Sequence, residues 1–172
     1  MDITQLILDD HAEQRRLFAI IEQIDPQDVE ALAAVWTRLA AFLDVHAEAE
    51  ERFFYPELLK RGEGANDAED GTVEGETGDA IEDHNKLRDA VKAVAAYPVG
   101  TGAWIEAVGR ANVVNSQHMA EEERQGLTDF RRHAPVARRH ELGVRFAAFE
   151  AEHITGVMPV NKDPDTYIEA NG

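Results

Sequence analysis

The amino-acid sequence predicts an all-α fold: an up-down-up-down four-helix bundle followed by an additional C-terminal helix and tail. Apolar residues recur at alternating steps of three and four along four segments, the pattern of the inward seam of a bundle helix. Short turn signals join these segments in pairs, so the helices within a pair should run antiparallel. A length of 172 residues with 44% hydrophobic content suits one sizeable core.

The first helix is expected over residues 3–24, and the second from Pro26 to about Lys60. Asp25 is a favoured N-cap residue, and proline is favoured at the first helical position. Pro56, near the end of the second helix, should bend or fray it. The inward seam of this helix contains Val29, Leu32, Trp36, Leu39, Leu43, His46, Glu50 and Phe53.

Residues 61–75 separate the two helix pairs and contain four glycines, many acids and almost nothing apolar, which predicts a mobile connector. The third helix is expected over residues 76–97, because a Pro-Val-Gly sequence at 98–100 breaks it. Thr101 should cap the fourth helix, which continues to about Phe130.

Two regions are predicted: a bundle over residues 1–130, and a helical extension over 131–172 that packs on the bundle or on a partner subunit. The extension should form a fifth helix over residues 136–153. Asp163 and Pro164 predict a cap for one final turn. Three histidines of this region are interpreted as surface or packing residues: His133, His140 and His153.

The strongest signal in the sequence is a repeated set of six metal-ligand residue types: His11, His46-x-x-x-Glu50, His84 and His118-x-x-x-Glu122. The lone histidines precede the pairs by 46 − 11 = 35 and 118 − 84 = 34 residues. Residues four apart lie on one face of a helix, so each His-x-x-x-Glu pair can reach one metal ion or two adjacent ones.

Imidazole and carboxylate ligands together suit iron, manganese or zinc, whereas the absence of cysteine excludes thiolate zinc sites and cysteine-ligated iron–sulfur clusters. A charged glutamate in an apolar seam is costly unless it is paired or bound to a metal. The alternative is a bundle without metal, in which the histidines and glutamates form buried ion pairs.

These residues resemble the hemerythrin-like family, also called HHE cation-binding domains, in its bacterial variant. The similarity covers about residues 3–130, and the flanking residues agree with it. These are Asp83 before His84, Glu51-Arg52-Phe53-Phe54-Tyr55-Pro56 after Glu50, and Glu121 and Glu123 around Glu122.

The resemblance implies a four-helix bundle that holds two non-haem iron ions. It assigns terminal ligand roles to the four histidines and bridging roles to Glu50 and Glu122. It also suggests Tyr55 as a further ligand, which Pro56 could swing toward the metal face. The fifth histidine of the oxygen-carrying hemerythrins is replaced here by Arg88, which leaves more positions for dioxygen or peroxide.

Four further residues of the predicted seams should surround the metal site. Phe18 lies seven residues after His11, and Phe53 lies seven after His46, so both should flank the metals. Gln14 and Asn115 are inward polar groups that could hold ligand residues through hydrogen bonds, or bond to the bundle interior instead.

The function expected from the resemblance is reaction with dioxygen or hydrogen peroxide, most concretely catalase-like decomposition of peroxide. The alternative is non-enzymatic binding or sensing of dioxygen, nitric oxide or iron.

The net charge of −17 argues against partners such as nucleic acid or anionic membrane surfaces. We expect a cytoplasmic protein, because the sequence starts without a signal-peptide pattern and contains no long apolar stretch. The oligomeric state is left open.

Overall fold

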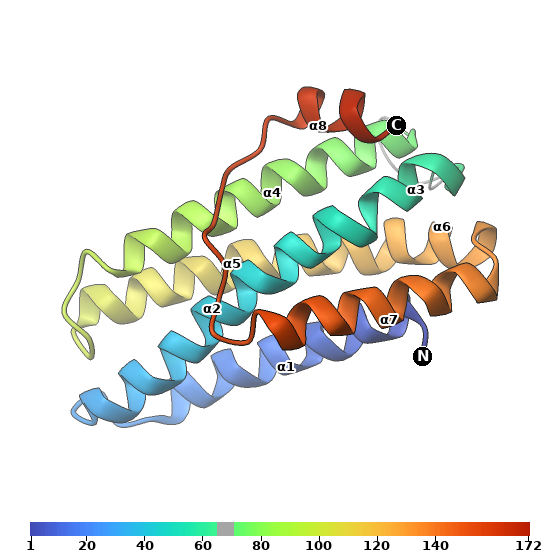
Figure 1. The fold of residues 1–172 in the computed structure, drawn as a ribbon. Helices are drawn as coiled ribbons and strands as arrows, with labels where there is room; N and C mark the ends of the chain where they lie inside the picture. Colours follow the sequence, from blue (N-terminus) through green and yellow to red (C-terminus); the bar gives the residue numbers. More distant parts are fainter. Residues whose placement is uncertain (65–70) are drawn as a thin grey trace.

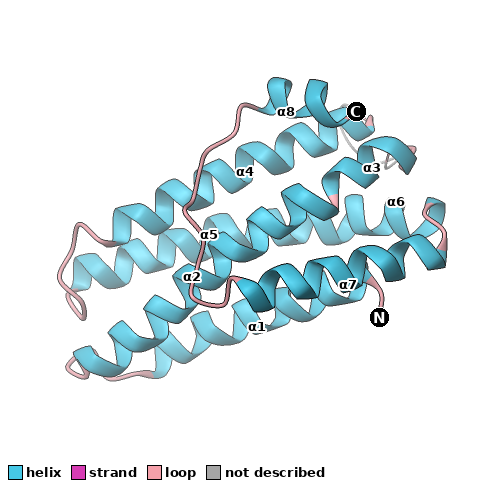
Figure 2. Ribbon diagram, viewed as in Figure 1, coloured by secondary structure: helices cyan, strands magenta, loops and turns pink. Residues whose placement is uncertain are grey.

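The computed structural model describes residues 1–64 and 71–172, and all regular secondary structure in these residues is α-helical. The prediction of an all-α bundle is therefore confirmed (Figures 1 and 2). The helices are α1 (Ile3–Gln23), α2 (Val29–Phe53), α3 (Tyr55–Arg61), α4 (Val73–Val94), α5 (Gly102–Arg124), α6 (Gly126–His133), α7 (Val136–Glu152) and α8 (Pro164–Asn171).

Four long helices, α1, α2, α4 and α5, form the bundle, and α1 contacts both α2 and α5 while α4 contacts both α2 and α5. The C-terminal helix α7 packs along α1 and α2 (Figure 1). The chain then crosses the bundle, and α8 packs on α4 and α3. The segment after residue 130 is thus in contact with both halves of the bundle.

The start of α2 differs from the prediction. Asp28, not Asp25, is the N-cap, and its side chain accepts a hydrogen bond from the backbone N–H of Ala31. Residues 25–28 instead form a turn, closed by a 2.8 Å hydrogen bond from the Asp28 N–H to the Asp25 carbonyl oxygen. The sequence offers two aspartates three residues apart, and the turn leaves only the second at the helix start.

Two predicted long helices are each broken into two. The second ends at Phe53 and resumes as α3 at Tyr55, because Pro56 lacks the N–H that would continue the helical hydrogen bonds and disfavours helical geometry before it. The fourth ends at Arg124 and resumes as α6 at Gly126, where a Cβ atom would lie 3.2 Å from Leu58 Cδ2. A glycine at that point lets α6 approach α3 closely.

The predicted boundaries of the connector over residues 61–75 are wrong at both ends. Arg61 belongs to α3, and α4 starts at Val73 because the Thr72 side chain accepts a hydrogen bond from the N–H of Gly75. Residues 65–70 of that connector lie outside the described residues. At its other end α4 stops at Val94, three residues before the predicted end.

The remaining boundaries follow the sequence closely. Thr101 caps α5 by accepting a hydrogen bond from the N–H of Trp104, and α7 spans the predicted fifth helix to within one residue. Asp163 caps α8, which continues to Asn171. His133 and His140 are exposed, and His153 stacks on Phe149 with ring centroids 4.1 Å apart, as interpreted from the sequence.

The buried apolar residues form two clusters that lie toward opposite ends of the bundle. One contains Leu17, Phe18, Leu39, Leu87 and Trp104, from the four long helices alone. The other joins the opposite ends of these helices to α3, α6, α7 and α8, and it includes Ile7, Ala49, Tyr55, Phe130, Phe146 and Tyr167. On α1, α4 and α5 the predicted ligands lie between members of the two clusters, and on α2 His46 and Glu50 lie next to Val45 and Ala49 of the second cluster.

Within residues 1–64 and 71–172, no helix has both the length and the apolar character that crossing a bilayer requires.

A partly buried ion pair connects α7 to α3. Arg138 donates two hydrogen bonds to the Glu57 carboxylate, at 2.9 and 2.6 Å, and Arg61 donates a third at 2.8 Å. The hydrogen bond from Arg138, reinforced by Arg61, outweighs the effect of burial and lowers the pKa of Glu57 from 4.5 to about 2. This carboxylate therefore stabilises the folded state above its ordinary pKa, and the stabilisation disappears as the pH falls toward 2.

Replacing Arg138 with Met is expected to lower the free energy of unfolding by about 1–2 kcal/mol at pH 7, since the pair is bidentate and partly buried. The difference from the unsubstituted protein should shrink as the pH falls from 4.5 toward 2. Urea unfolding across this pH range measures both quantities. The control is Arg132→Met, an exposed arginine that makes no ion pair within the described residues. An equal loss in the control, or a pH-independent difference, would contradict the expectation.

Candidate metal centre

Four buried histidines from four helices meet at the centre of the bundle. His11 is on α1, His46 on α2, His84 on α4 and His118 on α5, and each is at most 4% exposed. Each lies on the inward face because it continues the apolar seam of its helix. The fold therefore brings together side chains that are far apart in the sequence.

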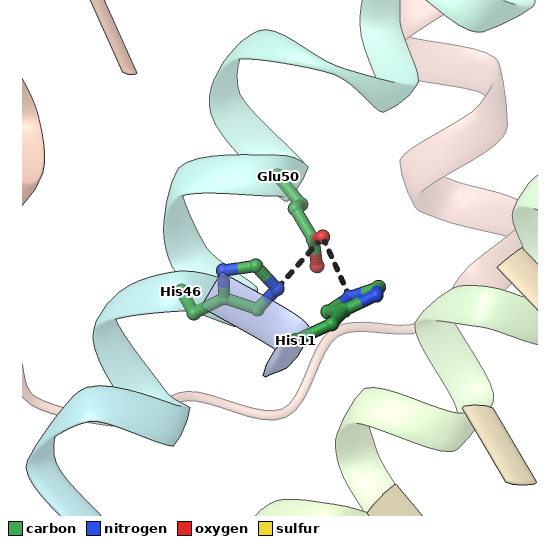
Figure 3. Close-up of side chains that lie close together, drawn as sticks. All are labelled: His11, His46 and Glu50. Carbon is green, nitrogen blue, oxygen red and sulfur yellow. Dashed lines mark ion pairs between the residues drawn. The ribbon is translucent and has the colours of Figure 1, made fainter. Parts of the chain in front are cut away.

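The Glu50 carboxylate lies between these histidines. Its Oε1 atom is 2.9 Å from His46 Nε2 and 3.9 Å from His11 Nε2 (Figure 3). Its Oε2 atom is 3.2 Å from His84 Nε2 and 4.0 Å from His118 Nε2. Each carboxylate oxygen thus faces a different pair of histidines.

Glu122 lies beside Glu50 and is also buried. Its Oε2 atom is 3.3 Å from His11 Nε2, and its Oε1 atom accepts a 2.8 Å hydrogen bond from the Tyr55 hydroxyl. The break at Phe54 directs Tyr55 into the bundle, where its ring lies 5.7 Å from that of His84. The hydroxyl therefore reaches the cluster through Glu122.

The arrangement of the nitrogen and oxygen atoms in this cluster suits metal binding better than it suits hydrogen bonding between the side chains themselves. Several buried atoms have no hydrogen-bond partner although they lie close together: His11 Nε2, His46 Nε2, both oxygens of Glu50, and Glu122 Oε2. Unpaired buried polar atoms are costly, so a shared cation explains their convergence. Within the described residues, three sets of three ligand atoms could each hold a metal ion: one contains Asp10, His46 and Glu150, and the two at the centre of the cluster are His11, His46 and Glu50, and Glu50, His84 and His118. Glu50 belongs to both central sets.

A second ring of carboxylates holds three of the histidines from behind. His46 Nδ1 lies 3.0 Å from Asp10, His84 Nδ1 lies 2.8 Å from Glu51, and His11 Nδ1 lies 2.9 Å from Glu123. In each pair the Nδ1–H can donate to the carboxylate, which leaves Nε2 as the free lone pair that faces Glu50 or Glu122. This is the tautomer that metal binding requires.

These three carboxylates were not predicted from the sequence. Asp10, Glu51 and Glu123 are each the chain neighbour of a predicted ligand, yet each supports a histidine on a different helix. The acidic residue beside each of these three ligands was a visible signal, but its partner depends on the order of the helices around the bundle axis.

Asp10 is also close to Glu150 of α7, and burial together with the charge of Asp10 raises the pKa of Glu150 to about 8.

The charges of the cluster shift the pKa values of its members in different directions. Burial lowers the pKa of His84, but Glu50 and Glu51 outweigh it and raise the pKa to about 9. Burial and the nearby charge of His84 hold the pKa of His118 well below its usual range. Burial and the charge of Glu50 raise the pKa of Glu122. Two carboxylates in this space repel each other, and a bound cation relieves that repulsion.

The four further residues predicted around the site are all close to the bundle interior, but their contacts differ. Gln14 and Asn115 are buried and bonded to each other, with Asn115 Nδ2 donating to Gln14 Oε1 at 2.9 Å. Phe18 belongs to the apolar cluster of the four long helices. Phe53 is half-buried and packs on Phe149 of α7.

Two other aromatic rings lie near His46, those of Phe42 and Phe146, with centroids 6.2 and 6.0 Å away.

A small cavity leads from the surface to one side of the cluster. It has a volume of about 20 Å³, which is room for a single water-sized molecule. Tyr55, His118 and Glu122 line its inner end. The lining also contains the acidic residues Glu76, Asp79, Asp83 and Glu121. The cluster is therefore accessible to very small molecules from between α4 and α5.

The sequence of residues 2–130 matches the family described as hemerythrin HHE cation-binding domain. The chain belongs to this family. Comparison with curated proteins and with solved structures gives no significant match. The match covers all six predicted ligand positions and ends before α7, so α7 and α8 lie outside it.

Membership of the hemerythrin HHE family agrees with the geometry of the cluster. The family is described as cation-binding, and the two overlapping His–Glu groups provide ligand atoms for cations. Arg88, at the place of the fifth histidine of the oxygen carriers, donates a 2.8 Å hydrogen bond to Glu51. Arg88 therefore holds the Glu51 carboxylate, which in turn contacts His84.

Removing bound metal is expected to destabilise the protein. A metal held at about 100 times its dissociation constant contributes about 3 kcal/mol, which corresponds to a fall of about 5–10 °C in Tm for a chain of this size. Differential scanning calorimetry of isolated, chelator-treated and iron-reconstituted protein measures this. His84→Ala is the matched variant, and its Tm should respond much less to the chelator. Superimposable transitions for loaded and stripped protein would contradict a metal role for the cluster.

Proposed function

We propose that this chain is a non-haem diiron protein that reacts with dioxygen or hydrogen peroxide, with catalase-like decomposition of peroxide as its activity. The observation that carries the proposal is the position of Glu50. Its two oxygens face two separate histidine pairs, as expected for a carboxylate that bridges two metal ions. Iron is the expected metal, and manganese or zinc suits the same ligands.

In this proposal the four histidines are terminal ligands, and Glu50 and Glu122 bridge the metals. One ion would be held by His11 and His46, and the other by His84 and His118. With two histidines and the shared carboxylates for each ion, the protein would leave coordination positions open. Bound iron would supply the redox change and a place for peroxide at those positions.

Tyr55 and the cavity support a small substrate. The hydroxyl of Tyr55 lies at the inner end of the cavity and donates to Glu122, so it can hold or deliver a proton there. Burial and the charge of Glu122 hold the pKa of Tyr55 well above its usual range, which keeps the hydroxyl protonated. A cavity of about 20 Å³ has room for one water-sized molecule, so peroxide or a diatomic gas suits it better than an organic substrate does.

The proposed reaction balances without an external reductant. One hydrogen peroxide molecule is oxidised to dioxygen, and a second is reduced to two molecules of water. The two protons and two electrons released by the first molecule are taken up by the second. The protein residues position the peroxide, exclude larger molecules and provide proton-holding groups beside it.

A second function is favoured by the size of the same cavity. Dioxygen and nitric oxide fit it as well as peroxide does, so the centre could bind a gas reversibly instead of turning over. Protein that loads two irons and binds nitric oxide, yet leaves peroxide unconsumed, would select this function.

Glu50→Gln is expected to reduce the iron content from about two ions per chain and to lower peroxide consumption at least about 100-fold, because the shared ligand loses its charge. Mass spectrometry of metals and a peroxide-consumption assay measure the two effects. Glu106→Gln, an exposed residue on α5, is the control and should behave like the unsubstituted protein. Peroxide consumption that persists in chelated protein would refute the proposal.

Tyr55→Phe tests whether the tyrosine binds the metal. If the phenolate is a ligand, iron-loaded protein should show a visible tyrosinate-to-iron charge-transfer band that the variant lacks. Resonance Raman spectroscopy identifies the phenolate vibrations directly. Tyr97→Phe, a partly exposed tyrosine after α4, is the control. An unchanged visible spectrum in Tyr55→Phe would restrict this residue to its hydrogen bond with Glu122.

A further inference from the structure

The C-terminal tail reaches the polar network behind the metal centre. After α7 the chain crosses the bundle toward α8 (Figure 1), and Lys162 lies just before the α8 cap. Its Nζ atom is 2.9 Å from Glu48 Oε2 and also forms an ion pair with Glu51 Oε2. Both acids belong to α2, whereas Lys162 lies beyond the part of the chain that matches the hemerythrin family.

Glu51 is the carboxylate that holds His84. Its Oε1 atom receives the 2.8 Å contact from His84 Nδ1 and a 2.8 Å hydrogen bond from Arg88. Lys162 occupies the opposite oxygen, and the Glu51 side chain is completely buried. Two cations and one imidazole therefore share a single buried carboxylate.

The backbone of Lys162 is fixed in this position. The Asn85 side chain donates to the Lys162 carbonyl oxygen at 2.6 Å and accepts from its N–H at 2.9 Å. In α8, the Tyr167 hydroxyl donates to the Glu51 carbonyl oxygen at 2.5 Å. Asn85 directly follows His84 in the sequence, so the tail is bonded to both sides of the His84–Glu51 pair.

We propose that Lys162 is a positioning residue for the metal centre: its charge, placed against Glu51, limits how strongly that carboxylate polarises the imidazole of His84. A carboxylate acceptor makes a ligand histidine more basic and stabilises the oxidised metal. A cation on the same carboxylate withdraws charge from it, which weakens this effect. Lys162 therefore raises the reduction potential of the metal held by His84. This inference rests on the proposed diiron function.

The competing interpretation is that Lys162 only anchors the tail to α2. Glu48, which is 15% exposed in its side chain, would suffice for that purpose. Anchoring the tail therefore does not require the contact with Glu51, which is the buried carboxylate that contacts His84. The two interpretations differ in what the charge of Lys162 does, so they can be separated by experiment.

The experiment measures the reduction potential of the iron-loaded, full-length protein by spectroelectrochemistry. In Lys162→Met the equilibrium constant for reduction should fall about tenfold, which is about 59 mV for one electron. Lys162→Gln keeps a hydrogen-bond donor without the charge and should show the same fall, including when the Met variant does not fold. Lys162→Arg should restore the original potential.

Two controls isolate the charge on Glu51. Glu48→Gln removes the other partner of Lys162 and leaves the contact with Glu51, so the potential should not fall. Lys60→Met removes an exposed lysine of α3 that makes no ion pair within the described residues, and it should leave the potential unchanged. An unshifted potential in both Lys162→Met and Lys162→Gln, or an equal fall in Glu48→Gln, overturns the proposal.

A second readout works without redox chemistry. In zinc-loaded protein, the NMR resonance of the His84 Nδ1–H proton should move downfield in Lys162→Met, because Glu51 becomes the stronger acceptor, and should return in Lys162→Arg. Wild-type protein that binds zinc but no redox-active iron pair refutes the proposed diiron function alone, and this resonance then decides on Lys162. Wild-type protein that binds no metal refutes both.

Discussion

The buried carboxylate of Glu50 is the constraint on which the rest of the structure depends. A charge in the centre of a bundle is tolerated only when other groups compensate it, and here four histidines from four helices surround it. Those histidines hold the four helices in register, and the apolar residues separate into clusters toward either end of the bundle. The position of the polar centre and the packing of the two apolar clusters therefore depend on each other. A shift of one helix would move a histidine away from the Glu50 carboxylate and would open a gap in a cluster.

The outer carboxylates extend this constraint across the helices. Asp10 links α1 to α2, Glu51 links α2 to α4, and Glu123 links α5 to α1. Each of these acids fixes the tautomer of a histidine while tying two helices together. The fourth histidine, His118, has instead the small acid-lined cavity on its side of the cluster. The three carboxylates thus lie behind His11, His46 and His84, and the cavity lies beside His118.

The C-terminal segment belongs to this network although it lies outside the family match. Its helix α7 places Phe146 against His46 and Glu150 near Asp10, and its tail brings Lys162 to Glu51. Arg88 contributes a second cation to Glu51. The charge environment of His84 therefore includes Glu51 and the two cations that contact this carboxylate, Arg88 and Lys162.

The sequence alone determined the helical fold, some of the helix boundaries and the six residues that meet at the centre, because periodicity along a helix is a local property. The spacing of His46 and Glu50 places them on one face whatever the other helices do. Only the tertiary structure decided which acid faces which histidine, because that depends on the order of helices around the bundle axis. It also decided the inward position of Tyr55, which follows from the interruption at Phe54, where a continuous helix would turn that side chain away. Lys162 was beyond sequence reasoning for the same reason, since its partner Glu51 is brought to it only by the path of the tail across the bundle.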